Sequence, residues 1–198
     1  MPALILATAS EVRQSLLKQS GIRFRTQAAR IDEAAIKSSM LQDGATPHDI
    51  ADALAEYKAR KVSQKHADAM VIGCDQVLEF HGKLLSKPKN VEGAISQLIE
   101  LRGHSHKLHS AVVIYENEQP VWRHVGQVRL EMRNLSDDYI AQYMSRNWPG
   151  IADSVGAYKL EQEGVRLFSR VEGDYFTVLG LPLLELIGYL TQRGVIEG

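Results

Sequence analysis

The sequence predicts an α/β protein, and three features of the chain lead to this prediction. Short apolar runs, of which Leu4-Ile5-Leu6 and Met70-Val71-Ile72 are the clearest, read as buried strands. Longer segments with apolar residues at helical spacing lie between such runs. The third feature is the length of 198 residues with 44% hydrophobic side chains, which is enough for one large domain or two small lobes.

The local signals give an expected order of elements. Strands are expected at 4–6, 24–28, 70–72, 77–80, 107–116, 121–133, 168–171 and 176–179, with a break at Gly73, a tight turn at His81-Gly82 and a hairpin turn at 117–120. Helices are expected at 11–20, from Pro47 through Val62, at 91–101, at 137–144 and from Pro182 onward. Ser10, Thr46 and Ser136 are suitable N-cap residues for three of these helices.

Composition and charge exclude several classes of protein. The formal net charge is −1, so we expect neither a general binder of nucleic-acid polymers nor a membrane-surface binder. The single cysteine, Cys74, cannot form an internal disulfide, which fits a reducing compartment. No apolar run approaches the ~20 residues of a membrane span, and the N-terminus does not read as a signal peptide. A cytoplasmic protein is therefore expected.

The stretch 70–88 carries the strongest chemical signal, because the acid Asp75 directly follows a buried strand. A strand fixes such an acid in place and the loop beyond it admits ligand. The alternative is that Asp75 only caps a turn. Cys74 next to it suggests a nucleophile, but neighbouring side chains on a strand point to opposite faces, so only one of the two lines a site. We expect Cys74 to be a small buried residue.

Charged residues elsewhere extend this signal. Lys58 falls on the apolar stripe of its helix, where lysines are rare without a partner, so it either snorkels or reaches a charged site. Arg13 stands where a capping box has Glu or Gln, which makes sense beside a bound anion, although a solvated arginine is the alternative. Together with Lys87, these cations and the acids Asp32, Glu33 and Asp75 make a plausible phosphoanhydride-cleaving site with a divalent cation. His104, His106 and His109 lack a completing ligand and do not predict a zinc site.

Several pieces of the chain match one family in order and spacing. They are Leu4-Ile5-Leu6-Ala7-Thr8-Ala9-Ser10 with Arg13, Ile31-Asp32-Glu33, Leu54-Ala55 with Lys58-Ala59, Gly73-Cys74-Asp75-Gln76-Val77, Lys87-Pro88, Leu101 with Gly103 and His106, Gly156-Ala157-Tyr158, and Gly180-Leu181-Pro182-Leu183. On these motifs the chain resembles, over essentially its full length, the Maf proteins, which are nucleoside triphosphate pyrophosphatases.

The resemblance implies both a fold and a reaction. The fold is α/β, related to inosine-triphosphate pyrophosphatases, with a long bent mixed sheet, flanking helices and two lobes around a central cleft, in one Maf-like domain over residues 1–198. The reaction is hydrolysis between the α- and β-phosphates, giving a nucleoside monophosphate and pyrophosphate. Asp75 matches the family's proton acceptor, and the positions that line its phosphate and metal site are matched by Ser10, Arg13, Glu33, Lys58 and Lys87. The cofactor implied is Mg²⁺ or Mn²⁺, with Glu33 and Asp75 as its expected ligands, and a homodimer is plausible.

Departures from the family pattern bear on the base of the nucleotide. Gln76 and Glu161 are similar to the branch that hydrolyses 7-methyl-GTP, and a carboxylate suits the N1–H and N2–H₂ donors of guanine. The dTTP/UTP branch has Thr and Gln at these positions. The 7-methyl-GTP branch has a tryptophan where this chain has Val12, which cannot stack on a cationic base. Two of three specificity positions therefore indicate 7-methyl-GTP.

Other functions stay open at this point. A dTTP/UTP pyrophosphatase has the same chemistry with a different base pocket. Family members have also been linked to septum formation and arrest of cell division, so a nucleotide-binding regulator is a second class of function. A housecleaning enzyme for deaminated purine triphosphates is suggested only by the related architecture.

Overall fold

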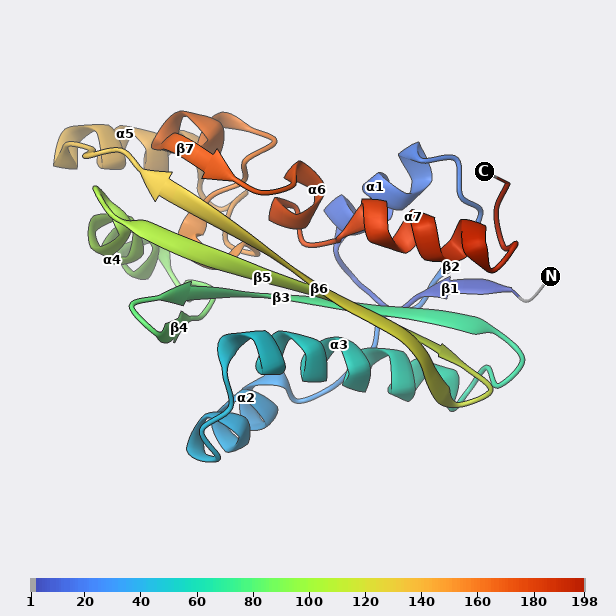
Figure 1. The fold of residues 1–198 in the computed structure, drawn as a ribbon. Coiled ribbons are helices and arrows are strands. Elements are labelled where there is room, and N and C mark those ends of the chain that lie inside the picture. The colour runs from blue at the N-terminus through green and yellow to red at the C-terminus, as the bar shows by residue number, and fades with distance from the viewer. Residues whose placement is uncertain (1–2, 198) are drawn as a thin grey trace. The chain divides into compact units, whose positions relative to one another are not determined.

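The computed structural model describes residues 3–197 and has a mixed α/β fold, as predicted (Figure 1). Its seven strands are β1 (Leu4–Leu6), β2 (Arg25–Thr26), β3 (Met70–Phe80), β4 (Lys83–Leu85), β5 (Ser105–Glu116), β6 (Gln119–Met132) and β7 (Phe168–Glu172). They form one sheet in the order β2-β1-β3-β5-β6-β7, with β4 paired to β3. β1 is parallel to β2 and β3, whereas the β3–β4 and β6–β7 pairs are antiparallel, so the sheet is mixed.

The helices are distributed along the whole chain. They are α1 (Glu11–Gln19), α2 (Glu33–Gln42), α3 (Pro47–Ser63), α4 (Val91–Leu101), α5 (Asp137–Asn147), α6 (Tyr175–Val178) and α7 (Leu183–Gln192), with 3₁₀ turns η1 (Val155–Ala157) and η2 (Glu163–Leu167). Within residues 3–197, no helix is long and apolar enough to cross a membrane.

The described residues form two compact units. Unit 1 lies within Met1–Gln76, His109–Gly126 and Asp174–Gly198, and unit 2 within Val77–Leu108 and Gln127–Gly173. The strands β3, β5 and β6 run from one unit into the other. A single Maf-like domain over residues 1–198 stays a prediction, and residues 1, 2 and 198 lie outside the described range.

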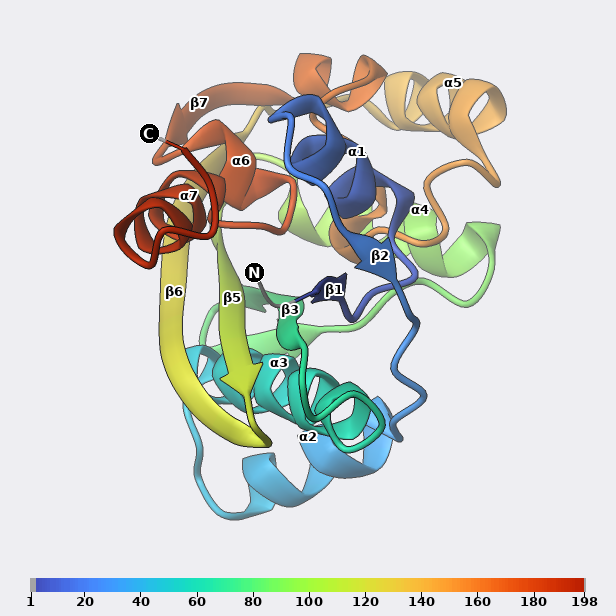
Figure 2. The same ribbon diagram turned by 90° about the vertical axis from the view of Figure 1, so that its right-hand side faces the viewer.

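The core of unit 1 follows the two-residue period of its strands. Alternate side chains of β1 and β3, such as Leu6, Ile72 and Cys74, pack against Leu17 of α1 and Leu186 of α7. The opposite face of the same strands is covered by α3, as Figure 2 shows. Because successive side chains alternate, Gly73 and Asp75 face α3 while Cys74 is buried on the other side. This confirms that Cys74 and Asp75 do not share a face.

The expected break at Gly73 is wrong, because β3 runs without interruption through this residue. The glycine is needed for close packing rather than for a turn. A Cβ placed on Gly73 would lie 2.1 Å from the carbonyl oxygen of Ala55 and 2.6 Å from the amide nitrogen of Ala59, both in α3. Only glycine therefore allows α3 to approach β3 this closely.

Three other expectations need correction. The segment 176–179 is not a strand: residues 176–178 belong to the short helix α6 and Leu179 is its C-cap, and the amides of Phe176 and Thr177 donate to the Asp174 side chain. The expected strand at 24–28 is reduced to β2, of two residues. The helix α2 was not expected, because it buries none of its residues fully and so leaves no apolar period in the sequence.

Candidate active site

Asp75 is the centre of the candidate site. It lies in β3 of unit 1, and the residue is only 4% exposed. Its Oδ1 atom accepts a hydrogen bond from the Nζ atom of Lys58 at 2.5 Å. Its Oδ2 atom is buried and has no hydrogen-bond partner among the described residues. A buried carboxylate oxygen without a partner is costly, which is typical of a group kept for chemistry or for a ligand.

Lys58 reaches this acid from α3. The helix begins with a capping box between Thr46 and Asp49, and its apolar stripe packs on β3, which buries Lys58 as well. The Nζ atom lies 2.7 Å from Oε1 of Glu33 in addition to its contact with Asp75. Burial opposes the charged amine, but the attraction of Asp75 and Glu33 prevails over burial and over repulsion by Arg13, so the pKa of Lys58 is raised. Lys58 therefore holds a positive charge between two acids. Of the two alternatives that the sequence offered, it reaches a charged site rather than snorkelling to the surface.

The two adjacent acids of the sequence, Asp32 and Glu33, have different roles in the structure. Asp32 is the N-cap of α2, and its Oδ1 atom accepts from the amide of Ala35 at 3.0 Å. Glu33 is the first residue of the helix and pairs with Lys58. Only the second acid thus belongs to the charged cluster.

Arg13 approaches the cluster from α1. Ser10 is the N-cap of this helix, as predicted, and accepts from the amide of Arg13 at 3.5 Å. The Nη1 atom of Arg13 donates to the carbonyl oxygen of Cys74 at 3.1 Å, next to Asp75 in the strand. Val12 is half-buried in the same helical turn. The structure therefore brings two cations and two acids together within unit 1: Arg13, Lys58, Glu33 and Asp75.

The side-chain amide of Gln76 takes part in a separate set of hydrogen bonds. Its Nε2 atom donates to Ser110 Oγ at 2.9 Å and to the carbonyl oxygens of Val178 at 2.9 Å and Thr177 at 3.2 Å. These acceptors use both N–H bonds of the amide. Any ligand contact of Gln76 is thus restricted to its acceptor, Oε1.

The acids of unit 1 fit a divalent cation that is completed by substrate. Within residues 3–197, no three His, Cys, Asp or Glu side chains gather into a metal-binding group. Mg²⁺, however, is commonly held by one or two protein carboxylates together with waters and substrate phosphates. Asp75, with its unpartnered Oδ2, and Glu33 provide such a pair.

The remaining predicted residues, Lys87 and Glu161, belong to unit 2 and are described within it. Both are exposed, and neither has a hydrogen-bond or ion-pair partner among residues 3–197. The segment that carries Glu161 is firmly anchored on its N-terminal side. Tyr158 is buried, and its hydroxyl lies 2.7 Å from the Nε2 atom of His106, whose pKa burial lowers to about 4.

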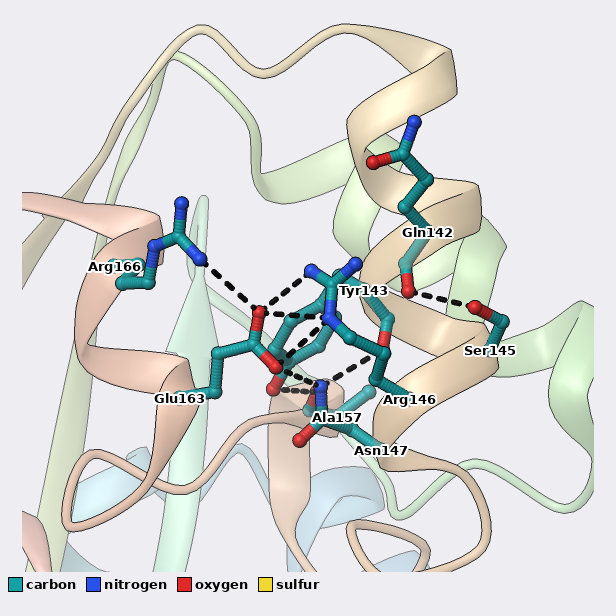
Figure 3. Close-up of polar contacts among 8 residues, drawn as sticks. All are labelled: Gln142, Tyr143, Ser145, Arg146, Asn147, Ala157, Glu163 and Arg166. Atoms are coloured by element: carbon teal, nitrogen blue, oxygen red, sulfur yellow. Dashed lines mark hydrogen bonds and ion pairs between the residues drawn. The ribbon is translucent and has the colours of Figure 1, made fainter.

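The C-terminal side of this segment is anchored by ion pairs (Figure 3). The carboxylate of Glu163 accepts from Nη2 of Arg146 at 2.6 Å and from Nδ2 of Asn147 at 2.9 Å, both in α5, and Arg166 lies 3.5 Å away. Directly after Glu163, a Cβ on Gly164 would lie 2.4 Å from the carbonyl oxygen of Lys159, so the backbone folds back tightly on the residues before Glu161. Glu161 thus projects from a well-fixed loop.

Sequence reasoning missed the glycine that makes the site possible. Gly73 was interpreted as a break, although it permits α3 to place Lys58 beside Asp75. The available signal was an isolated glycine inside an apolar, strand-like run, which is typical of close backbone approach.

Known proteins similar to this chain identify its family. The profile described as Maf-like protein matches residues 3–193. The nucleoside triphosphate pyrophosphatase of Ruegeria pomeroyi is 58% identical over 98% of both chains, and the 7-methyl-GTP pyrophosphatase of Rhizobium meliloti is 44% identical over 99% of this chain and 98% of its own. The solved Staphylococcus aureus Ham1 protein aligns with 94% of this chain and 98% of its own at 15% identity and a TM-score of 0.46, too low to support an argument. The profile match and the two relatives show that the chain belongs to the Maf family.

Proposed function

We propose that this protein is a nucleoside triphosphate pyrophosphatase that hydrolyses the α–β phosphoanhydride to a nucleoside monophosphate and pyrophosphate. The observation that carries the proposal is Asp75, a buried acid that is paired with Lys58 through one oxygen and has no partner at the other. The names of relatives that match 98% of the chain support the same reaction.

The residues of unit 1 supply the chemistry that this reaction requires. The Oδ2 atom of Asp75 accepts a proton from the attacking water, whose oxygen bonds to a phosphorus of the anhydride while the bridging P–O bond breaks. Arg13 and Lys58 stabilise negative charge on the phosphoryl oxygens, and Ser10 contributes a hydroxyl beside the helix N-terminus. Asp75 and Glu33 would hold Mg²⁺ or Mn²⁺, which neutralises phosphate charge when bound. Lys87 is proposed as a further phosphate-binding cation, from its match to the family motif.

The substitution Asp75→Asn tests the proposed base. It keeps the shape of the side chain but removes the proton acceptor, so we expect pyrophosphate release with Mg²⁺ to fall by at least about 100-fold. The circular dichroism spectrum of Asp75→Asn should match that of the natural chain, which shows that the variant is folded. The control is Asp137→Asn in α5, which also removes an acid from a cation, Arg102, but at a side chain that is 79% exposed. Full activity of Asp75→Asn, or equal loss in both variants, would contradict the assignment.

We further propose 7-methyl-GTP as the preferred substrate. Within unit 2, the exposed carboxylate of Glu161 has no hydrogen-bond or ion-pair partner among residues 3–197 and is the kind of acceptor that the N1–H and N2–H₂ donors of guanine require. Within unit 1, Gln76 keeps the acceptor Oε1 and matches the 7-methyl-GTP branch at its position. The Rhizobium meliloti relative has 7-methyl-GTP in its name, whereas relatives of higher identity are named only as nucleoside triphosphate pyrophosphatases. Val12 gives no support, because it offers no aromatic face for a cationic base.

A small panel of nucleotides tests this preference. Pyrophosphate release is measured with 7-methyl-GTP, GTP, dTTP, UTP, CTP and ITP in the presence of Mg²⁺. We expect the highest kcat/KM for 7-methyl-GTP, and Glu161→Gln should reduce this preference over UTP. A preference for dTTP or UTP would overturn the base assignment while the reaction stands. Nucleotide binding without release from any of them would instead favour a regulatory binding protein.

A further inference from the structure

We infer that Gly180 is a positioning residue for Arg13: its missing side chain leaves the space in which the guanidinium lies. The inference rests on the proposed function, in which Arg13 binds phosphate. It adds Gly180 as a residue that fixes the position of Arg13. Gly180 follows α6 in unit 1 and belongs to a sequence motif, Gly180-Leu181-Pro182, to which the proposed reaction gives no role.

The geometry at Gly180 is specific to the head of the arginine side chain. A Cβ placed on Gly180 would lie 2.8 Å from Nε, 2.9 Å from Nη2 and 3.3 Å from Cζ of Arg13. These three atoms belong to one planar guanidinium group, so the group lies directly against the α-carbon of the glycine. Since a side chain is easier to move than backbone, any residue larger than glycine would displace the guanidinium. The backbone φ of +91° also favours glycine here.

The other side of the guanidinium is held by β3. Nη1 of Arg13 donates to the carbonyl oxygen of Cys74 at 3.1 Å. Cys74 directly precedes Asp75, so the strand that carries the proposed base also orients the proposed phosphate ligand. The guanidinium therefore has a backbone surface at Gly180 and a fixed acceptor at Cys74, which together set its plane.

The turn that ends in Gly180 is attached to the same strand. The amide of Gly180 donates to the carbonyl oxygen of Thr177 at 3.1 Å. That oxygen, with the carbonyl oxygen of Val178, accepts from Nε2 of Gln76, two residues after Cys74 in β3. Three consecutive residues of β3 thus organise the site: Cys74 orients Arg13, Asp75 holds Lys58, and Gln76 holds the turn of Gly180.

A double-mutant cycle between positions 13 and 180 tests the inference. In the natural chain we expect Gly180→Ala to lower kcat/KM on the order of tenfold to a hundredfold, the effect of a misplaced positioning group. Arg13→Lys has no planar guanidinium to displace. In that background Gly180→Ala should change kcat/KM by no more than about twofold, the scatter expected of independent substitutions. Affinity for inorganic pyrophosphate, measured by calorimetry, should follow the same pattern without any turnover.

The matched control is Gly21→Ala, at the end of α1. Its φ is +78°, but nothing lies within 4 Å of the added Cβ, so it introduces the backbone strain alone and should leave kcat/KM unchanged. If Gly180→Ala does not fold, Gln76→Met replaces it in the cycle, because it releases the turn without touching Gly180. The cycle is then measured only by the affinity for inorganic pyrophosphate, which has no base for Gln76 to contact. An equal loss in the natural chain and in the Arg13→Lys background, or no loss in the natural chain, would overturn the inference. The absence of pyrophosphate release from the natural chain, or full activity of Arg13→Lys alone, would instead overturn the proposed function on which the inference rests.

Discussion

A charged cluster in unit 1 and a charged network in unit 2 differ in how their charges are satisfied. In unit 1, the Lys58 cluster consists of Lys58, Asp75 and Glu33, and the side chains of Lys58 and Asp75 are 11% and 6% exposed. In unit 2, the Glu163 network consists of Arg146, Asn147, Glu163 and Arg166, and the side chains of Arg146 and Glu163 are 43% and 22% exposed (Figure 3). Lys58 and Asp75 have therefore given up most of their contact with water, whereas Glu33 keeps a side chain that is 39% exposed.

Hydrogen bonding differs in the same direction. Both carboxylate oxygens of Glu163 accept hydrogen bonds, from Arg146 and Asn147. Asp75 has one oxygen on Lys58 and the other buried without a partner among the described residues. A network in which both oxygens of Glu163 accept hydrogen bonds holds α5 to η2, whereas the buried cluster keeps an unpartnered oxygen at an energetic cost. The comparison indicates structure in unit 2 and chemistry in unit 1.

Removing the cation of the buried cluster should have the largest effect. In Lys58→Met the carboxylate of Asp75 stays buried without its partner, so we expect the free energy of unfolding to fall by ~3–5 kcal/mol. Urea unfolding measures this change, and pyrophosphate release should be lost as well. The same substitution at Lys61, which is exposed on the same helix, should leave both quantities nearly unchanged.

A second substitution identifies the cause of this loss. The variant Lys58→Met/Asp75→Asn has no unpaired buried charge at Asp75 and should regain most of the stability, but not the activity. If it is no more stable than Lys58→Met, the cost comes from packing at Lys58 rather than from the charge of Asp75.

The next largest effect is expected at the contact that brings the cluster together. In Gly73→Ala the new Cβ meets backbone atoms of α3, at Ala55 and Ala59, so the helix must move away from β3. Overpacking of this kind costs about 1–3 kcal/mol, and the shift should separate Lys58 from Asp75 and reduce activity. Thermal unfolding and pyrophosphate release are measured on the same samples. Gly188→Ala in α7 is the control, because it has open space around its Cβ and should not destabilise the protein. Unchanged stability of Gly73→Ala would disprove the close-packing argument.

The features predicted correctly from the sequence are those with local causes. Ser10, Thr46 and Ser136 cap their helices as expected, because a cap depends on residues within one turn. The apolar stripe of α3 made Lys58 conspicuous for the same reason: one helical period is enough to show a charge in a buried position.

The features that were missed depend on packing between distant segments. The close approach at Gly73 requires α3, and the acceptor of Arg13 is a backbone carbonyl that any residue at position 74 would supply. The aromatic and β-branched residues within 176–179 favoured a strand, but Asp174 caps a helical turn there. The roles of Lys87 and Glu161 stay predictions, because they come from family motifs and not from contacts.

The smallest effect is expected from breaking the exposed network. In Glu163→Gln at pH 7 we expect only a slight decrease in Tm, because solvent screens an exposed ion pair. Pyrophosphate release from UTP, which does not depend on a guanine contact, should be retained. Arg166→Gln, which removes the longest contact of the network, should change Tm even less.

The pH dependence of that small effect distinguishes a true ion pair from simple packing. Hydrogen bonds from Arg146, and then from Asn147, lower the pKa of Glu163 from its ordinary value of 4.5 to about 2. A lowered carboxyl pKa stabilises the fold above the ordinary value, and this stability is lost as the pH falls toward the lowered one. The Tm difference between the natural chain and Glu163→Gln should therefore be constant above pH 4.5 and disappear between pH 4.5 and about 2. A difference that persists to pH 2 would mean that the side chain acts by packing, and the contrast with the buried, incompletely satisfied cluster of unit 1 would then lose its electrostatic basis.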